Sequence, residues 1–208
     1  MQDQTTNRLT GSMSNSMPES VPETLDKAFL KDTQQNIVQD NEHVNCILYN
    51  RTSGKLVGKV ALDDVQAQLA QHQDYFVWIY LLKPSDDVLH KIQQDFDLHD
   101  LAIEDTTMVL QRTKIEMYGD LLFVVFGTVS HIQQPEGIEF GSTNIFLGER
   151  FLISVRQGDM LCEKEVITLS INNPKHVKHG PSYIFYTLMN CMVEQYLPIL
   201  EQMHDRLE

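Results

Sequence analysis

Residues Tyr75–Leu82 have the sequence YFVWIYLL, an almost uninterrupted apolar run of strand length. Runs of this kind are typical of a strand that is buried on both faces. Pro84-Ser85-Asp86-Asp87 follows and predicts a helix start, because Ser85 can cap the helix and the aspartates favour its positive end. The helix would carry its apolar face at Val88, Leu89, Ile92 and Phe96. The segment therefore predicts a central buried strand followed at once by a helix packed against it.

Shorter segments of both kinds lie on either side of this unit. Strands are predicted at Val44–Tyr49, Lys55–Val60, Lys114–Met117, Leu121–Val129, Ile138–Phe146 and Phe151–Val155. Further helices are predicted at Leu62–Leu69, Asp100–Thr106 and Leu161–Ile171. This order predicts an α+β fold in α/β/α layers, in which a mixed, largely antiparallel sheet is flanked by helices.

The two ends of the chain differ from this central part. Residues 1–41 begin with a stretch poor in aliphatic side chains, so we expect a disordered or poorly ordered tail. Residues 42–179 would form the layered domain. Residues 180–208 predict the start of a long helix that contains Pro198 and ends without a capping residue, as in a truncated helix. Its apolar stripe consists of Phe185, Leu188, Met189, Met192, Tyr196, Ile199, Met203 and Leu207.

The net charge, the cysteines and the lack of long apolar runs exclude some classes of partner and location. Asp and Glu number 29 against 16 Lys and Arg, which gives a formal charge of −13 and argues against nucleic acid and anionic membrane surfaces. The three cysteines are far apart and contain no Cys-x-x-Cys pair, which favours a reducing compartment. No signal peptide or membrane-spanning run is present, so we expect this chain to be soluble.

Candidate chemistry is sparse. Nucleotide loops, a nucleophile elbow and a His-Glu-x-x-His motif are all missing from the sequence, so we expect no enzyme. The adjacent carboxylates Glu104 and Asp105 could help to bind a hard cation, or could form ordinary salt bridges with a neighbour such as Lys114. His176 and His179 could share a metal, although a solvated loop is the favoured interpretation.

Several blocks together resemble the cytoplasmic domain of the CorA-like family of divalent-cation transporters. They are the Trp78 strand with Pro84-Ser85, the segment Phe96–Asp105 (FDLHDLAIED), the segment Gln111–Tyr118 (QRTKIEMY), the segment Phe146–Arg156, and Gly180-Pro181-Ser182-Tyr183 leading to Tyr196–Leu200. Asp97 stands where the family has Gly, and Asp100 and Thr113 stand where it has Pro.

The resemblance implies a homopentamer on the cytoplasmic face of the inner membrane, with residues 180–208 as the start of a stalk helix. The family's membrane helices and Gly-Met-Asn pore loop are absent from this sequence. In the family, divalent ions, magnesium or cobalt above all, bridge neighbouring cytoplasmic domains and bias the pore closed. Asp105 matches the interface ligand and Glu104 its neighbour. Asn190 stands where an acidic ligand is often present.

Other functions stay open at this point. The chain could be a free-standing soluble domain that binds metal or a partner protein through its last helix. It could also be the cytoplasmic domain of a zinc-transporting relative, although oxygen ligands favour a hard ion. An enzyme that uses Glu104, Asp105 and His99 is the remaining alternative.

Overall fold

The structure of this chain is a computed structural model, and it describes residues 44–108, 112–133, 136–158 and 162–205. The tail predicted at residues 1–41 lies outside these residues. Within them, the mixed α+β architecture predicted from the sequence is confirmed. The strand Tyr75–Leu82 has the predicted bounds, and Ser85 caps the next helix by accepting a hydrogen bond from the Val88 amide at 3.5 Å.

A seven-stranded sheet in the order β2-β1-β3-β7-β6-β5-β4 forms the middle layer. Its strands are β1 (Val44–Asn50), β2 (Lys55–Val60), β3 (Tyr75–Leu82), β4 (Lys114–Tyr118), β5 (Leu121–Gln133), β6 (Glu136–Leu147) and β7 (Phe151–Arg156). Strand β3 pairs with β7 in parallel, and every other described pairing is antiparallel. Because β7 returns beside β3, the early hairpin and the later meander join into one sheet.

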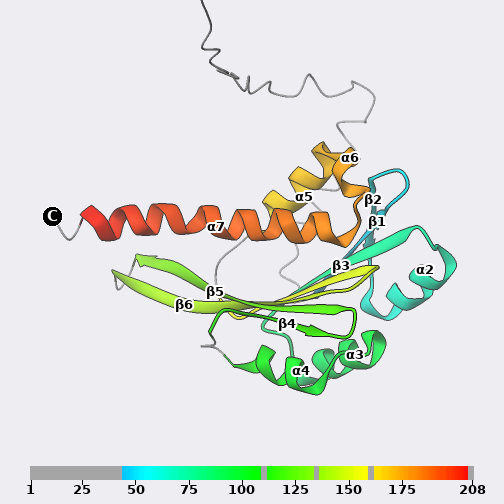
Figure 1. The fold of residues 1–208 in the computed structure, drawn as a ribbon, viewed down its shortest axis with the longest axis horizontal. Helices are drawn as coiled ribbons and strands as arrows, with labels where there is room; N and C mark the ends of the chain where they lie inside the picture. Colours follow the sequence, from blue (N-terminus) through cyan, green and yellow to red (C-terminus); the bar gives the residue numbers. More distant parts are fainter. Residues whose placement is uncertain (1–43, 109–111, 134–135, 159–161, 206–208) are drawn as a thin grey trace, which may run out of the picture.

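Helices cover both faces of this sheet (Figure 1). One face carries α2 (Val65–Gln71), which follows the short 3₁₀ turn η1 (Leu62–Asp64), together with α3 (Asp86–Phe96) and α4 (Asp100–Thr107). The other face carries α5 (Glu163–Asn172), α6 (Pro174–Val177) and α7 (Pro181–Asp205). We call these the α4 face and the α7 face.

Alternation along the strands builds a separate apolar core on each face. On β3, Phe76 and Trp78 point toward the α7 face, whereas Val77 and Ile79 point toward the α4 face. All four side chains are buried, which confirms the prediction that this strand is covered on both sides. The Trp78 indole N–H also donates to the Ser154 hydroxyl at 3.1 Å, so its polar atom is satisfied inside the core.

Helix α7 belongs to the core in its first half. Leu188 and Met192 of the predicted stripe are buried in the α7-face cluster, and Phe185 and Met189 pack against it partly buried. Ile184, which the predicted stripe did not include, is also buried there. The helix continues through Pro198, although proline cannot donate the hydrogen bond expected there. A second set of apolar side chains on α7 is exposed, at Tyr186, Val193 and Leu197.

The segment after α5 differs from its prediction. Residues 175–180 were expected to form a polar loop, whereas Pro174–Val177 forms the short helix α6 with Pro174 at its start. Val177 is fully buried and holds this turn against the core. Gly54 of the β1–β2 turn has φ +73° and lies so close that a Cβ there would meet the Pro174 carbonyl.

Candidate metal site on α4

Helix α4 presents the two candidate carboxylates. Its first turn is capped by His99, whose Nδ1 accepts a hydrogen bond from the Leu101 amide at 3.2 Å. Ala102 and Thr106, one helical turn apart, are both fully buried and seat the helix on the sheet. Gln157 Nε2 donates to the Thr106 carbonyl at 2.9 Å and ties the end of α4 to the residue after β7. These contacts fix the direction in which Asp105 points.

The neighbouring strand β4 has two distinct sides. Lys114, Glu116 and Tyr118 alternate along it and lie on the face that α4 covers, because their sheet partners include core residues of that face. Ile115 and Met117 lie on the opposite side and are exposed. The alternation therefore gathers three polar side chains beside Asp105.

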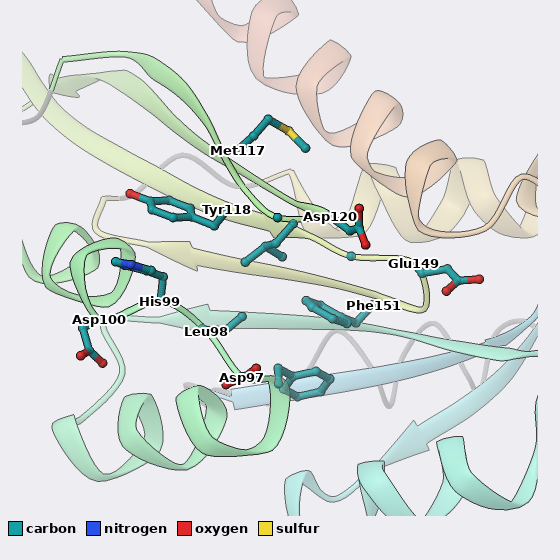
Figure 2. A pocket seen from close by; sticks show the side chains of 13 residues that line it. Asp97, Leu98, His99, Asp100, Met117, Tyr118, Asp120, Glu149 and Phe151 are labelled. Atoms are coloured by element: carbon teal, nitrogen blue, oxygen red, sulfur yellow. The ribbon is translucent and has the colours of Figure 1, made fainter.

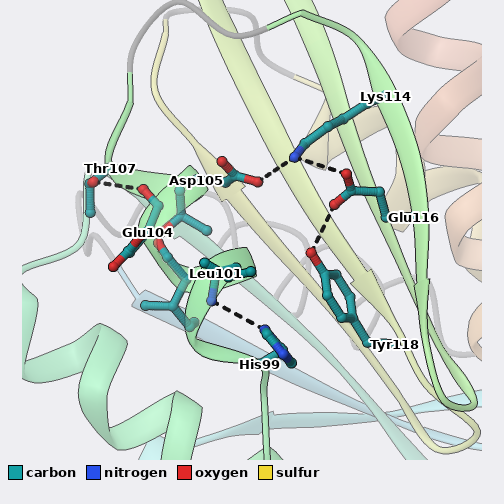
Figure 3. Close-up of polar contacts among 10 residues, drawn as sticks. His99, Leu101, Glu104, Asp105, Thr107, Lys114, Glu116 and Tyr118 are labelled. Carbon is teal, nitrogen blue, oxygen red and sulfur yellow. Dashed lines mark hydrogen bonds and ion pairs between the residues drawn. The ribbon is translucent and has the colours of Figure 1, made fainter.

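These side chains form one chain of contacts (Figure 3). Lys114 Nζ lies 2.7 Å from Asp105 Oδ2 and 3.2 Å from Glu116 Oε1. The Tyr118 hydroxyl donates to Glu116 Oε2 at 2.8 Å. Lys114 also lies over the ring of the buried Phe123, 5.8 Å from its centroid. The lysine ammonium is therefore shared between two carboxylates above an aromatic ring.

Burial and charge act together at this position. The Asp105 side chain is 17% exposed and Lys114 is 34% exposed, so solvent reaches both without surrounding either. The hydrogen bond to Asp105 is the largest cause of a raised Lys114 pKa, and Glu116 adds to it. The hydrogen bond to Glu116 likewise raises the Tyr118 pKa. At neutral pH Lys114 is thus an ammonium and Tyr118 a neutral phenol.

The two adjacent carboxylates diverge, as expected for neighbours on a helix. Asp105 faces β4, whereas Glu104 is exposed and points away from Lys114 (Figure 3). Asp105 forms the salt bridge to Lys114 that the sequence offered as one of two interpretations. Tyr118 is the member of the group that the sequence interpretation missed, and period-two alternation from Lys114 could have found it.

Asn190 lies elsewhere in the same chain. It is exposed on α7, across the sheet from α4 (Figure 1), and its side-chain amide donates to Glu194 Oε1 at 2.7 Å. The structure does not bring Asn190 together with Asp105 and Glu104. In the part of the chain that the structure describes, no group of three or more His, Cys, Asp or Glu side chains could hold a metal ion.

A depression of about 820 Å³ lies beside this group, between the start of α4 and two strand turns (Figure 2). His99 and Tyr118 stack along its wall with their ring centroids 4.6 Å apart. Its lining also includes four acidic residues, Asp97, Asp100, Asp120 and Glu149. Tyr118 therefore lies between Glu116 on one side and this acidic depression on the other.

The remaining candidate ligands, two histidines and the cysteines, take part in packing. His176 and His179 stack with centroids 6.3 Å apart, and His176 also stacks on Tyr183, so the pair takes part in aromatic packing. The cysteines are buried, and burial raises the pKa of Cys46 and of Cys162 to about 12. Their thiols therefore stay protonated at neutral pH.

A layered domain followed by a long final helix also occurs in a known family of proteins. Residues 73–208 match the family model described as CorA-like Mg²⁺ transporter protein. The chain belongs to this family.

Curated relatives agree. The chain is 29% identical over 130 residues to "Putative metal ion transporter YfjQ" of Bacillus subtilis, covering 62% of this chain and 40% of that protein. It is 23% identical over 124 residues to the cobalt/magnesium transport protein CorA of Thermotoga maritima, covering 59% of this chain and 35% of that protein. The chain thus spans well under half the length of these relatives.

Solved structures show the same fold. The soluble domain of CorA from Methanocaldococcus jannaschii matches with a TM-score of 0.55 and 14% identity, over 78% of this chain and 61% of that chain. Full-length CmaX matches with a TM-score of 0.62 and 15% identity, over 81% of this chain and 51% of that chain. In the described residues, no helix is both long and apolar enough to cross a bilayer.

Proposed function

We propose that this chain is the cytoplasmic regulatory domain of a CorA-type divalent-cation channel and that Asp105 binds the regulatory ion. Magnesium, or cobalt in its place, is the proposed ion. The observation that carries the proposal is the position of Asp105, a largely buried carboxylate that solvent still reaches, in a chain of this family.

The donor set fits one part of a magnesium site. Magnesium prefers oxygen ligands and keeps several of its waters, so one or two carboxylates from a given chain are enough. Asp105 and Glu104 are such donors on one helix. Asn190 lies across the sheet, so it would join the site only from a neighbouring subunit. We therefore place the site between subunits of a homopentamer.

Such a site would bias the pore through electrostatics. Carboxylates of neighbouring subunits repel each other, and a divalent ion between them removes that repulsion. The ion stabilises the arrangement that brings the subunits together, in proportion to its difference in affinity for the two states. Falling magnesium would then favour the open arrangement.

Zinc is less well suited to this group. The side chains around Asp105 offer oxygen donors, which favour a hard ion such as magnesium. Magnesium requires no ligand type beyond the carboxylates of α4.

The proposal also assigns a role to each part of the chain and a location in the cell. Residues 42–179 would form the domain, residues 180–208 the start of the stalk helix, and residues 1–41 the tail. The domain would lie at the cytoplasmic face of the cell membrane. A free-standing protein-binding domain is the alternative, and the exposed apolar residues Tyr186, Val193 and Leu197 of α7 favour it.

The test is ion flux in the transporter that carries this chain, measured against cytosolic magnesium. Asp105→Ala should raise the magnesium concentration needed for closure by about fivefold or more. Asp63→Ala is the matched control, because Asp63 also pairs with a lysine but is 85% exposed. Unchanged closure in Asp105→Ala would remove Asp105 from the mechanism, and absence of any magnesium-dependent closure in the unaltered protein would favour the alternative.

A further inference from the structure

Lys114 is in a position to compete with any cation that approaches Asp105. Its ammonium lies 2.7 Å from Asp105 Oδ2, so it occupies one carboxylate oxygen and repels a cation that approaches the other. The Asp105 side chain is held in this contact by α4, whose buried face leaves it little freedom to turn away. A divalent ion would therefore bind Asp105 more tightly once Lys114 has withdrawn.

Glu116 gives Lys114 a second partner. Glu116 Oε1 is already 3.2 Å from the ammonium, and its other oxygen accepts the hydrogen bond from Tyr118. A small movement of the flexible lysine stem would leave the ammonium on Glu116 alone. Withdrawal would therefore not leave the charge without a carboxylate, which lowers the free energy that the exchange requires.

We propose that Lys114 is an internal competitor that moves between Asp105 and Glu116 and sets the concentration at which a divalent cation binds Asp105. This inference rests on the proposed function, because it takes Asp105 as the ligand. A partly exposed ion pair is weak enough to be displaced and strong enough to lower the apparent affinity. Tyr118 serves as a positioning residue, since it holds Glu116 where the displaced ammonium can reach it.

Lys91 is a matched control in the same chain. Its ammonium also lies between two carboxylates, 3.2 Å from Asp63 Oδ1 and 3.0 Å from Asp95 Oδ2. Its side chain is 36% exposed, close to the 34% of Lys114. Removal of either lysine changes the net charge equally, so a general electrostatic effect would appear in both variants.

The experiment is a magnesium titration of the 208-residue chain, followed by the NMR shifts of the backbone amides of residues 104–107. Lys114→Gln should tighten magnesium binding by about three- to fivefold, the value of an ion pair worth about 1 kcal/mol. Lys91→Gln should leave the affinity unchanged. Lys114→Arg keeps the charge but can hold a carboxylate through two hydrogen bonds, so it should weaken binding.

The outcomes distinguish a failure of the Asp105 ligand assignment from a failure of the competitor role of Lys114. Asp105→Asn should abolish the shifts of residues 104–107. If Asp105→Asn leaves a magnesium-dependent shift there intact, or if neither the unaltered chain nor the full transporter that supplies the neighbouring subunit binds magnesium in an Asp105-dependent way, the ligand assignment fails and this inference fails with it. If Asp105→Asn abolishes the shift but Lys114→Gln and Lys114→Arg leave the affinity as it was, Asp105 remains a ligand and the competitor role alone is overturned.

Discussion

The chain holds two lysines between pairs of carboxylates, and the two groups differ in how they are built. Lys91 joins Asp95, four residues later on α3, to Asp63, whose side chain is 85% exposed. Lys114 joins Asp105 of α4, which is 17% exposed, to Glu116 of β4 above the buried ring of Phe123. The first group joins α3 to the exposed Asp63 of η1, whereas the second joins a helix to a strand over a buried ring.

This difference indicates which kind of ion pair can take part in function. Exposed pairs at helical spacing contribute little and bind nothing in particular. A pair fixed by tertiary packing keeps its carboxylate in one direction, and removal of either partner alters the field that the other experiences.

Phe123→Ala should have the largest effect on stability, because it removes the buried ring over which Lys114 lies. Phe123 is fully buried and stacks near Phe146 with centroids 4.8 Å apart. We expect a loss of about 3–5 kcal/mol in the free energy of unfolding, measured by urea denaturation. A loss below about 1 kcal/mol would show that this ring is not part of a packed core.

Asp105→Ala should destabilise the fold by about 1 kcal/mol in metal-free buffer, because Lys114 loses the nearer of its two carboxylates. Asp63→Ala should leave the unfolding midpoint unchanged. Equal effects in the two variants would contradict the distinction between the packed and the exposed group.

Tyr118→Phe should destabilise by about 0.5–1 kcal/mol, because it removes the hydrogen bond to Glu116 while keeping the ring against His99. The loss of unfolding free energy in Tyr118→Phe combined with Glu116→Ala should be smaller than the sum of the two single losses, because both changes remove the same hydrogen bond. Additive losses would show that Tyr118 acts elsewhere.

The smallest effect concerns alkaline pH. The folded-state pKa of Lys114 is raised, so its contribution is fully present below the ordinary lysine pKa and is lost as pH rises through the folded value. The difference in unfolding free energy between the unaltered chain and Lys114→Gln should therefore shrink from pH 8 to pH 12. A constant difference over this range would show that the charge on Lys114 is not what stabilises the group.

Much of the fold could be predicted from the sequence because its signals are local. The apolar run of β3, the Ser85 cap and the alternation in β4 each depend on neighbouring residues. The position of β7 beside β3 could not be predicted, because that parallel pairing joins residues more than seventy positions apart. The short helix α6 was missed because its polar residues resemble a loop, and only the burial of Val177 fixes it.

The candidate site could be predicted less well. The carboxylates of α4 stand out in the sequence, and Lys114 was recognised as one possible partner. Spacing could not decide that Lys114 reaches Asp105, since this requires α4 and β4 to pack side by side. Spacing also gave no indication that Asn190 and Asp105 lie on opposite faces of one sheet.

The most direct test of the central claim is a crystal structure of this chain grown with cobalt, with the ion located by anomalous diffraction. We predict a cobalt ion on the Asp105 carboxylate, with the Lys114 ammonium withdrawn to Glu116. A cobalt-saturated crystal in which Lys114 still lies against Asp105, with the ion bound elsewhere, would contradict the account.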